Sequence, residues 1–192
     1  MLFTKKKGTY QYLKKAPVWQ GLITIVLLML PAGLFFIGYS ITKDVKNLFT
    51  VAAVVGMLPA AKSIVSFIMF LRAEKWTCPQ ELHDFASKLT GENFKVGYDY
   101  YMTSYSVNYP IYCAAVGKTS LIGYLVNDKV SDNDCESYLK EYLKKNEING
   151  ITVKIFKDEE KFKNRLETLS QSNDALTEAE LKAYMLLSSL SL

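Results

Sequence analysis

The pattern closest to a catalytic motif is Gly117–Ser120, which reads GKTS and matches the end of a phosphate-binding loop. In such a loop, backbone amides surround the phosphates, the lysine pairs with them and a helix follows at once. The loop also needs a glycine five residues before the Gly-Lys pair, where this chain has Tyr112. The residues that follow, Leu121–Val126, have the pattern of a strand. We therefore interpret Gly117–Ser120 as a tight turn between two strands.

A second candidate is a cluster of acidic residues, Asp128, Asp132, Asp134 and Glu136, whose carboxylates are ligands that Ca²⁺ prefers. With Asp132 as the first ligand, however, the sixth position lacks the required glycine and the twelfth lacks the glutamate. Acidic side chains also favour the first turn of a helix, where they meet the positive end of its dipole. We interpret the cluster as the start of a helix.

Histidine and cysteine offer little further chemistry. His83 is the only histidine, so a His-based zinc site or catalytic dyad would depend on this residue alone. Cys78, Cys113 and Cys135 are odd in number, widely spaced and without a CxxC pair, which favours reduced thiols over a disulfide framework. We predict a structural or surface histidine, and no catalytic, cofactor-binding or metal-binding residue.

Two long apolar runs precede the part of the chain that holds these groups. No charged side chain occurs from Ala16 to Thr42, and Lys62 is the only one from Leu48 to Leu71. A helix needs about 20 apolar residues to cross roughly 30 Å of hydrocarbon. The sequence predicts a basic cytoplasmic segment (1–17), a two-helix transmembrane hairpin (18–71, with helices at about 18–42 and 48–71) and a cytoplasmic α+β domain (77–192).

Charge is divided unevenly along the chain, and this division predicts orientation and partners. Residues 1–76 carry ten Lys and Arg against two acids, whereas residues 77–192 carry thirteen against seventeen. Lysines gather before the first apolar run, and Arg72 and Lys75 follow the second, so both termini are expected in the cytoplasm at the cell membrane. A mildly acidic domain argues against binding to nucleic acid, which relies on clustered Lys and Arg.

Two features of the second run point to contacts within the bilayer. Ala52, Gly56 and Ala60 recur every four residues, a spacing at which small side chains let helices approach closely. This seam would serve either the first span or a second copy. Lys62 lies near the middle of the span, where a charge costs roughly 2.5–3.5 kcal/mol and usually faces a partner or water. Lys62 is therefore our intramembrane candidate.

The remaining residues predict the order α-β-β-β-α-β-α-α. In the strand at 94–102, alternation places Phe94, Val96, Tyr98 and Tyr100 on one side. The other expected elements are a helix from Cys78 to Gly91, strands at 107–116, 121–126 and 151–156, helices at about 134–146 and 158–169, and a last helix that starts with the capping box Thr177–Glu180.

The first six of these elements are similar in order to the core of the PD-(D/E)XK nuclease family. That family places an acid on its second strand and an acid-x-Lys on its third, and paired carboxylates then hold a metal. The corresponding stretches here are Asn108–Tyr112 and Ser120–Tyr124, and neither carries a carboxylate. The resemblance therefore implies a fold of this order in an inactive form.

The expected function is non-catalytic: an integral membrane protein whose cytoplasmic domain is an interaction or regulatory module. Its partners would be the lipid bilayer and either another protein or further copies of the chain. Two alternatives stay open, a membrane-tethered enzyme with a degenerate nuclease-like fold and a subunit of a small oligomeric channel or transporter with Lys62 in its pathway.

Overall fold

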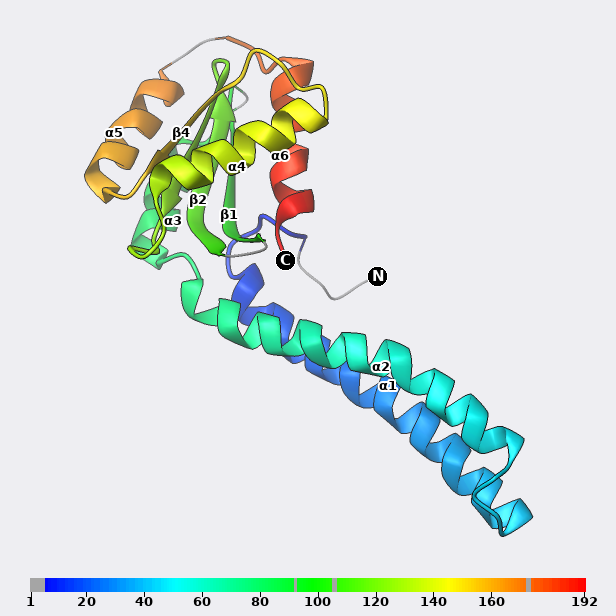
Figure 1. The fold of residues 1–192 in the computed structure, drawn as a ribbon. Coiled ribbons are helices and arrows are strands. Elements are labelled where there is room, and N and C mark those ends of the chain that lie inside the picture. The colour runs from blue at the N-terminus through cyan, green and yellow to red at the C-terminus, as the bar shows by residue number, and fades with distance from the viewer. Residues whose placement is uncertain (1–5, 92, 105–106, 172–173) are drawn as a thin grey trace. The chain divides into compact units, whose positions relative to one another are not determined.

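A computed structural model describes residues 6–91, 93–104, 107–171 and 174–192, and these form two compact units (Figure 1). Residues 14–75 make up the first unit. The second unit combines residues 6–13 with residues 76–192, so a short segment that precedes the apolar runs packs with the domain that follows them.

The first unit is a helical hairpin of α1 (Tyr12–Thr42) and α2 (Leu48–Ala73), joined by a five-residue loop. Asn47 caps α2, because its side-chain oxygen accepts a hydrogen bond of 2.8 Å from the Thr50 amide. By length and composition, both helices are able to cross a membrane. Among the described residues outside this hairpin, only Leu181 and Met185 expose large apolar side chains.

The second unit is an α+β domain with the predicted order of elements. A short 3₁₀ helix (Glu74–Trp76) follows α2 in the chain. The elements of the domain are then α3 (Gln80–Leu89), β1 (Lys95–Thr103), β2 (Asn108–Gly117), β3 (Ser120–Leu125), α4 (Asp132–Lys145), β4 (Thr152–Phe156), α5 (Glu159–Ser170) and α6 (Glu178–Leu190). The capping box predicted for the last helix is confirmed by reciprocal hydrogen bonds between Thr177 and Glu180.

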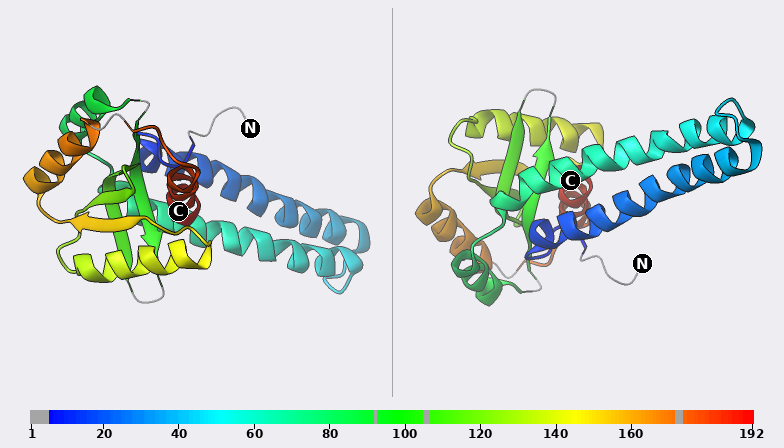
Figure 2. Two further views of the ribbon diagram at one scale, coloured as in Figure 1. Left: turned by 90° about the horizontal axis from the view of Figure 1, so that it is seen from above. Right: turned by 90° about the horizontal axis from the view of Figure 1, so that it is seen from below.

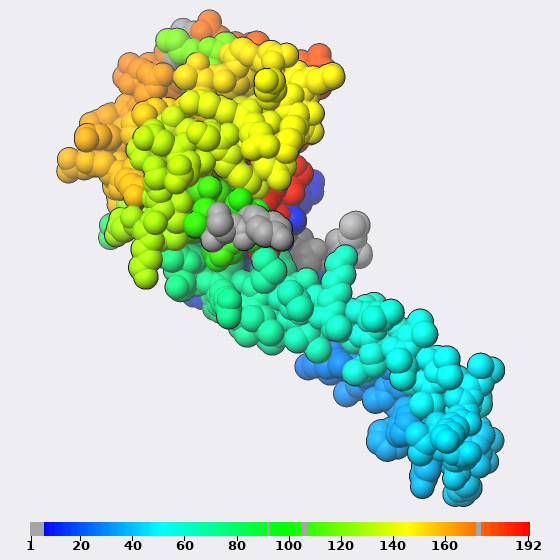
Figure 3. Space-filling model, viewed as in Figure 1, coloured from blue at the N-terminus to red at the C-terminus, as the bar shows by residue number. Residues whose placement is uncertain are grey.

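The four strands form one mixed sheet in the order β1-β2-β3-β4. The first three strands are antiparallel neighbours, and β4 runs parallel to β3 because α4 connects them across the sheet. Helices α4 and α6 cover one face, and α3 and α5 cover the other (Figure 2). Seen from outside, the side chains of α4 hide much of the sheet beneath them (Figure 3).

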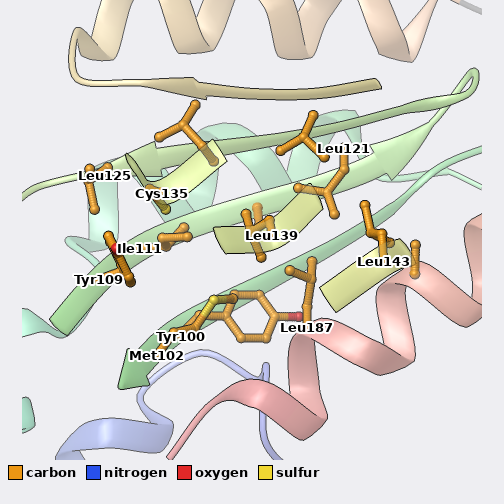
Figure 4. Packing of buried hydrophobic residues seen from close by; sticks show 14 of the residues in the cluster. Tyr100, Met102, Tyr109, Ile111, Leu121, Leu125, Cys135, Leu139, Leu143 and Leu187 are labelled. Carbon is orange, nitrogen blue, oxygen red and sulfur yellow. The ribbon is translucent and has the colours of Figure 1, made fainter. Parts of the chain in front are cut away.

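Each face of the sheet has its own apolar core. Toward α4 and α6, Tyr100 and Met102 of β1 pack with Leu139 and Leu187 (Figure 4). Toward α3 and α5 lies the second core, which comprises Cys78, Leu82, Ala86, Phe94, Tyr98, Cys113, Ala115, Ile122, Phe162, Leu166 and Leu169. A sheet buried on both faces explains why the second strand is nearly continuous in apolar residues.

The regular alternation of β1 breaks at Asp99, and β2 is irregular at the same level. Asp99 has a left-handed backbone (φ 57°), and the register between β2 and β3 shifts between Ile111 and Cys113, as in a β-bulge. Tyr98 therefore faces the core under α3 and α5, whereas Tyr100 faces the core under α4 and α6. The prediction that Tyr100 shares the face of Tyr98 is wrong, because it assumed an uninterrupted strand.

Gly97 provides a test of this arrangement. A Cβ atom at position 97 would collide with the phenol of Tyr100, which is fully buried. We expect Gly97→Ala to reduce the free energy of unfolding by about 1–3 kcal/mol, the usual cost of overpacking a core. Gly91→Ala is the matched control, because a Cβ atom there meets no atom within 4 Å. Thermal unfolding of the full chain in detergent can be followed with a thiol-reactive dye, since all three cysteines are buried. Equal melting temperatures for the two variants would contradict the packing described.

Candidate functional site

The small residues of the seam predicted in α2 differ in how far they are buried. Ala60 is fully buried, a Cβ atom at Gly56 would lie 3.4 Å from the Cβ of Pro31, and Ala52 is exposed. Ala53 and Ser63 are also buried in α2. The side of α2 that packs within the hairpin therefore follows residues 53, 56, 60 and 63, a spacing of three and four residues that keeps one helical face toward α1.

A hydrogen-bonded cluster joins the two helices of the hairpin. The Ser63 hydroxyl lies 2.8 Å from the Thr24 hydroxyl and accepts a hydrogen bond of 3.1 Å from the Gln20 side-chain amide. Thr24 and Ser63 are both buried. Such polar contacts help to specify how helices pair where surrounding side chains are apolar.

Lys62 comes directly before Ser63 in the sequence, but its side chain lies on the exposed side of α2. Among the described residues, its side chain makes no ion pair or hydrogen bond, and its backbone carbonyl accepts a bond of 3.2 Å from the Ser66 hydroxyl. An open recess elsewhere on the hairpin is apolar. It lies between α1 and α2 near Pro31 and Met57, has a volume of about 460 Å³ and is lined by Leu28, Pro31, Ala32, Phe35, Phe36, Thr50, Ala53, Val54 and Met57.

The GKTS motif forms the turn that the sequence predicts. Gly117 ends β2 and Ser120 begins β3, and Lys118 and Thr119 both have left-handed backbones, as in a two-residue hairpin turn of type I′. The Thr119 amide donates a hydrogen bond of 2.5 Å to the Glu180 carboxylate of α6. The turn thus binds a side chain of its own domain, and no helix follows it.

The acidic cluster also serves the fold. Asp132 and Asp134 lie in the first turn of α4, as predicted. Glu136 is buried; its Oε1 accepts a hydrogen bond of 3.0 Å from the Ile155 amide and lies 3.0 Å from the Lys154 ammonium. These partners lower the pKa of Glu136 despite the opposing effect of burial. No three His, Cys, Asp or Glu side chains in the described parts of the chain converge as metal ligands.

The strands that correspond to the nuclease-like positions carry aromatic rings instead of carboxylates. Tyr112 of β2 and Tyr124 of β3 are half-buried, with their ring centroids 5.9 Å apart. Tyr124 also stacks on Phe162 of α5, with a centroid distance of 5.9 Å. This arrangement extends the apolar core toward the surface and offers hydroxyl groups but no metal ligand set.

The unusual polar group of the domain is Asp99, the residue with the left-handed backbone in β1. Its side chain is completely buried, and Oδ1 accepts a hydrogen bond of 2.7 Å from the Cys78 amide. The backbone amides of Gln11, Tyr12 and Leu13, around the start of α1, also face the carboxyl group. One carboxylate therefore contacts the stretch that precedes the first apolar run and the stretch that follows the second.

The pKa of Asp99 reflects two opposed effects. Burial raises the pKa of Asp99, and the four facing backbone amides lower it by a smaller amount. The net result is a pKa of about 6. Oδ2 accepts no hydrogen bond of standard geometry from the described residues, so one oxygen of a buried carboxyl group lacks a partner. At neutral pH Asp99 is therefore ionised, although burial has removed water from its carboxylate.

Residues 6–13 cover Asp99 and the adjoining edge of β1. The Tyr98 amide donates a hydrogen bond of 2.9 Å to the Gly8 carbonyl, and the ring of Tyr10 stacks on His83 at a centroid distance of 3.9 Å. Leu13 is fully buried. His83 therefore has a structural contact, as predicted, and also pairs with Asp84 at 3.0 Å.

The chain end covers the same edge of β1 further along. The Ser191 hydroxyl accepts a hydrogen bond of 3.0 Å from the Tyr101 amide, and the Leu192 amide donates one of 3.0 Å to the Tyr101 carbonyl. Lys7 joins the two covering segments, because its ammonium donates a bond of 2.7 Å to the Ser191 carbonyl. The exposed backbone of an edge strand is thereby protected on this side.

Sequence reasoning did not single out Asp99. The available signal was a lone carboxylate between Tyr98 and Tyr100 in a strand of otherwise apolar or aromatic residues. The contacts of Asp99 come from positions 11–13 and 78, which are distant in sequence. No local pattern connects them.

Comparison with known proteins assigns no family to this chain. No protein-family model, curated protein or solved structure matched it.

The role of Asp99 as an acceptor can be tested with two substitutions. Asn keeps a side-chain oxygen for the Cys78 amide and tolerates a left-handed backbone, whereas Ala does neither. We expect Asp99→Ala to have a free energy of unfolding about 1–3 kcal/mol below that of Asp99→Asn, the cost of leaving a buried donor unpaired. The measurement is thermal unfolding with the thiol-reactive dye at pH 7. An alanine variant as stable as the asparagine variant would show that Asp99 does not hold position 78.

Proposed function

We propose that this protein is a two-span membrane protein at the cell membrane whose cytoplasmic α+β domain is a non-catalytic interaction module. The observation that carries the proposal is Lys62, an exposed cation near the middle of the apolar helix α2. A buried or partnered lysine would belong to the fold of the hairpin. An exposed one, at a depth where a charge is costly, indicates a contact outside the chain.

The chemistry of the hairpin favours a different protein over a second copy as the partner of Lys62. Each copy has no acidic residue from Ala16 to Thr42 or from Leu48 to Leu71, so a second hairpin would bring another lysine and no opposite charge. A transmembrane helix with a carboxylate would supply the missing charge. The buried carboxylates of the domain fit a non-catalytic role, because Asp99, Glu136 and Glu180 accept hydrogen bonds from backbone amides of their own chain.

The proposed orientation places the loop at residues 43–47 outside the cell and the domain in the cytoplasm. We expect a membrane-impermeant thiol reagent to label Asp44→Cys in intact cells and Lys129→Cys only after lysis, since both positions are exposed. The unmodified chain gives the baseline, because its three cysteines are buried. Labelling of position 129 in intact cells would reverse the orientation.

The proposed partner contact predicts a specific effect of Lys62→Leu. We expect this variant to insert at least as well as the native chain but to lose about 5- to 30-fold in recovery of its partner, as for a polar interhelical contact of 1–2 kcal/mol. The measurement is quantitative affinity purification of the tagged full chain in mild detergent.

Two further variants separate charge from position. Lys62→Arg keeps the cation at its depth and should keep most of the partner. Lys46→Leu removes an exposed lysine from the loop and should have no effect. If Lys62→Leu recovers the same complex as the native chain, Lys62 is not the contact.

A further inference from the structure

The docking of residues 6–13 on the domain depends on a small set of contacts. It rests on the hydrogen bond from the Tyr98 amide to Gly8, the bond from Lys7 to Ser191, the stacking of Tyr10 on His83 and the burial of Leu13. These contacts enclose Asp99 at the edge strand β1. If the segment leaves, water reaches a carboxyl group that is otherwise completely buried.

We propose that Asp99 makes this docking proton-linked: residues 6–13 close over β1 with uptake of a proton at the Asp99 carboxyl group, and they open with its release. The geometry that supports this is a buried carboxyl oxygen without a hydrogen bond of standard geometry, in a residue with a left-handed backbone whose carboxyl group faces the amides of residues 11–13. A neutral carboxylic acid is far cheaper to enclose than a carboxylate.

The direction of the effect follows from linkage. Burial raises the pKa of Asp99 to about 6 in the docked form, and an exposed aspartate has a pKa of about 3.9. The closed form therefore binds the proton more tightly, so its added stability is complete below about pH 4 and is lost as the pH rises through about 6. Mild acid closes the segment, and neutral or alkaline conditions loosen it.

Other titratable groups lie close to Asp99 and have to be distinguished from it. Burial raises the pKa values of Cys78 beside it and of Tyr112 and Cys113 on β2, so these groups stay neutral from pH 5 to pH 8. The remaining nearby charges are Lys7, which binds Ser191, and Glu159 of α5, which faces Cys78. The imidazole of His83 stacks on Tyr10 of the segment, so its contribution is tested separately.

The test is amide hydrogen exchange of the full chain in detergent micelles, read by mass spectrometry and corrected for the intrinsic effect of pH. We expect the protection of residues 8–13 to fall about tenfold between pH 5 and pH 8, the ratio that linkage gives for these two pKa values. Protection of β4 should not change in parallel. Asp99→Asn should abolish the tenfold change, whereas His83→Gln and the exposed-site control Asp128→Asn should retain it.

Two results of the exchange experiment would overturn the proposal: a tenfold change that persists in Asp99→Asn, or one that disappears in His83→Gln. If Asp99→Asn does not fold, the native chain still decides the matter through a ¹³C titration of its aspartate carboxyl groups. One aspartate with a midpoint near pH 6 is expected. If no aspartate titrates above pH 5, the segment does not close with proton uptake.

Discussion

The domain is built around a buried carboxyl group at the edge of its sheet. Asp99 accepts a hydrogen bond from the Cys78 amide and faces the amides of residues 11–13. One side chain thus holds together two stretches of chain that lie more than 60 residues apart in sequence. The cost of burying it is met by these amides only in part, as its unpartnered oxygen and raised pKa show. Burying the Asp99 carboxyl group costs free energy, but the buried group binds backbone amides of two segments. This balance suits it to reversible docking of residues 6–13.

The same residue sets the shape of the sheet. Its left-handed backbone, together with the irregularity of β2 at Tyr112, turns Tyr98 and Tyr100 toward opposite cores. Residues 6–13 and the segment around Ser191 then cover the edge of β1. An uncovered edge would present unpaired amides and carbonyls to other chains, so these segments protect the domain from unwanted strand pairing.

The hairpin divides its polar groups between two faces. Gln20, Thr24 and Ser63 bond to one another between the helices, where they stabilise the pairing of α1 with α2. Lys62 lies outside this cluster, on the exposed side of α2. The inward groups satisfy each other, whereas the outward lysine has a hydrogen-bonding capacity that the hairpin does not use.

The sequence by itself determined the elements and their order. Apolar run length predicts two helices able to span a membrane, and periodicity and caps such as Thr177 predict the helices and strands of the domain, because these signals act over a few neighbouring residues. Sequence also predicted the turn at Gly117–Ser120, which the structure confirms. The tertiary structure alone revealed that residues 6–13 belong to the domain, that Tyr100 changes face and that Asp99 is the polar centre of the site. Each of these depends on a contact between distant residues, and such a contact leaves no periodic trace in the chain.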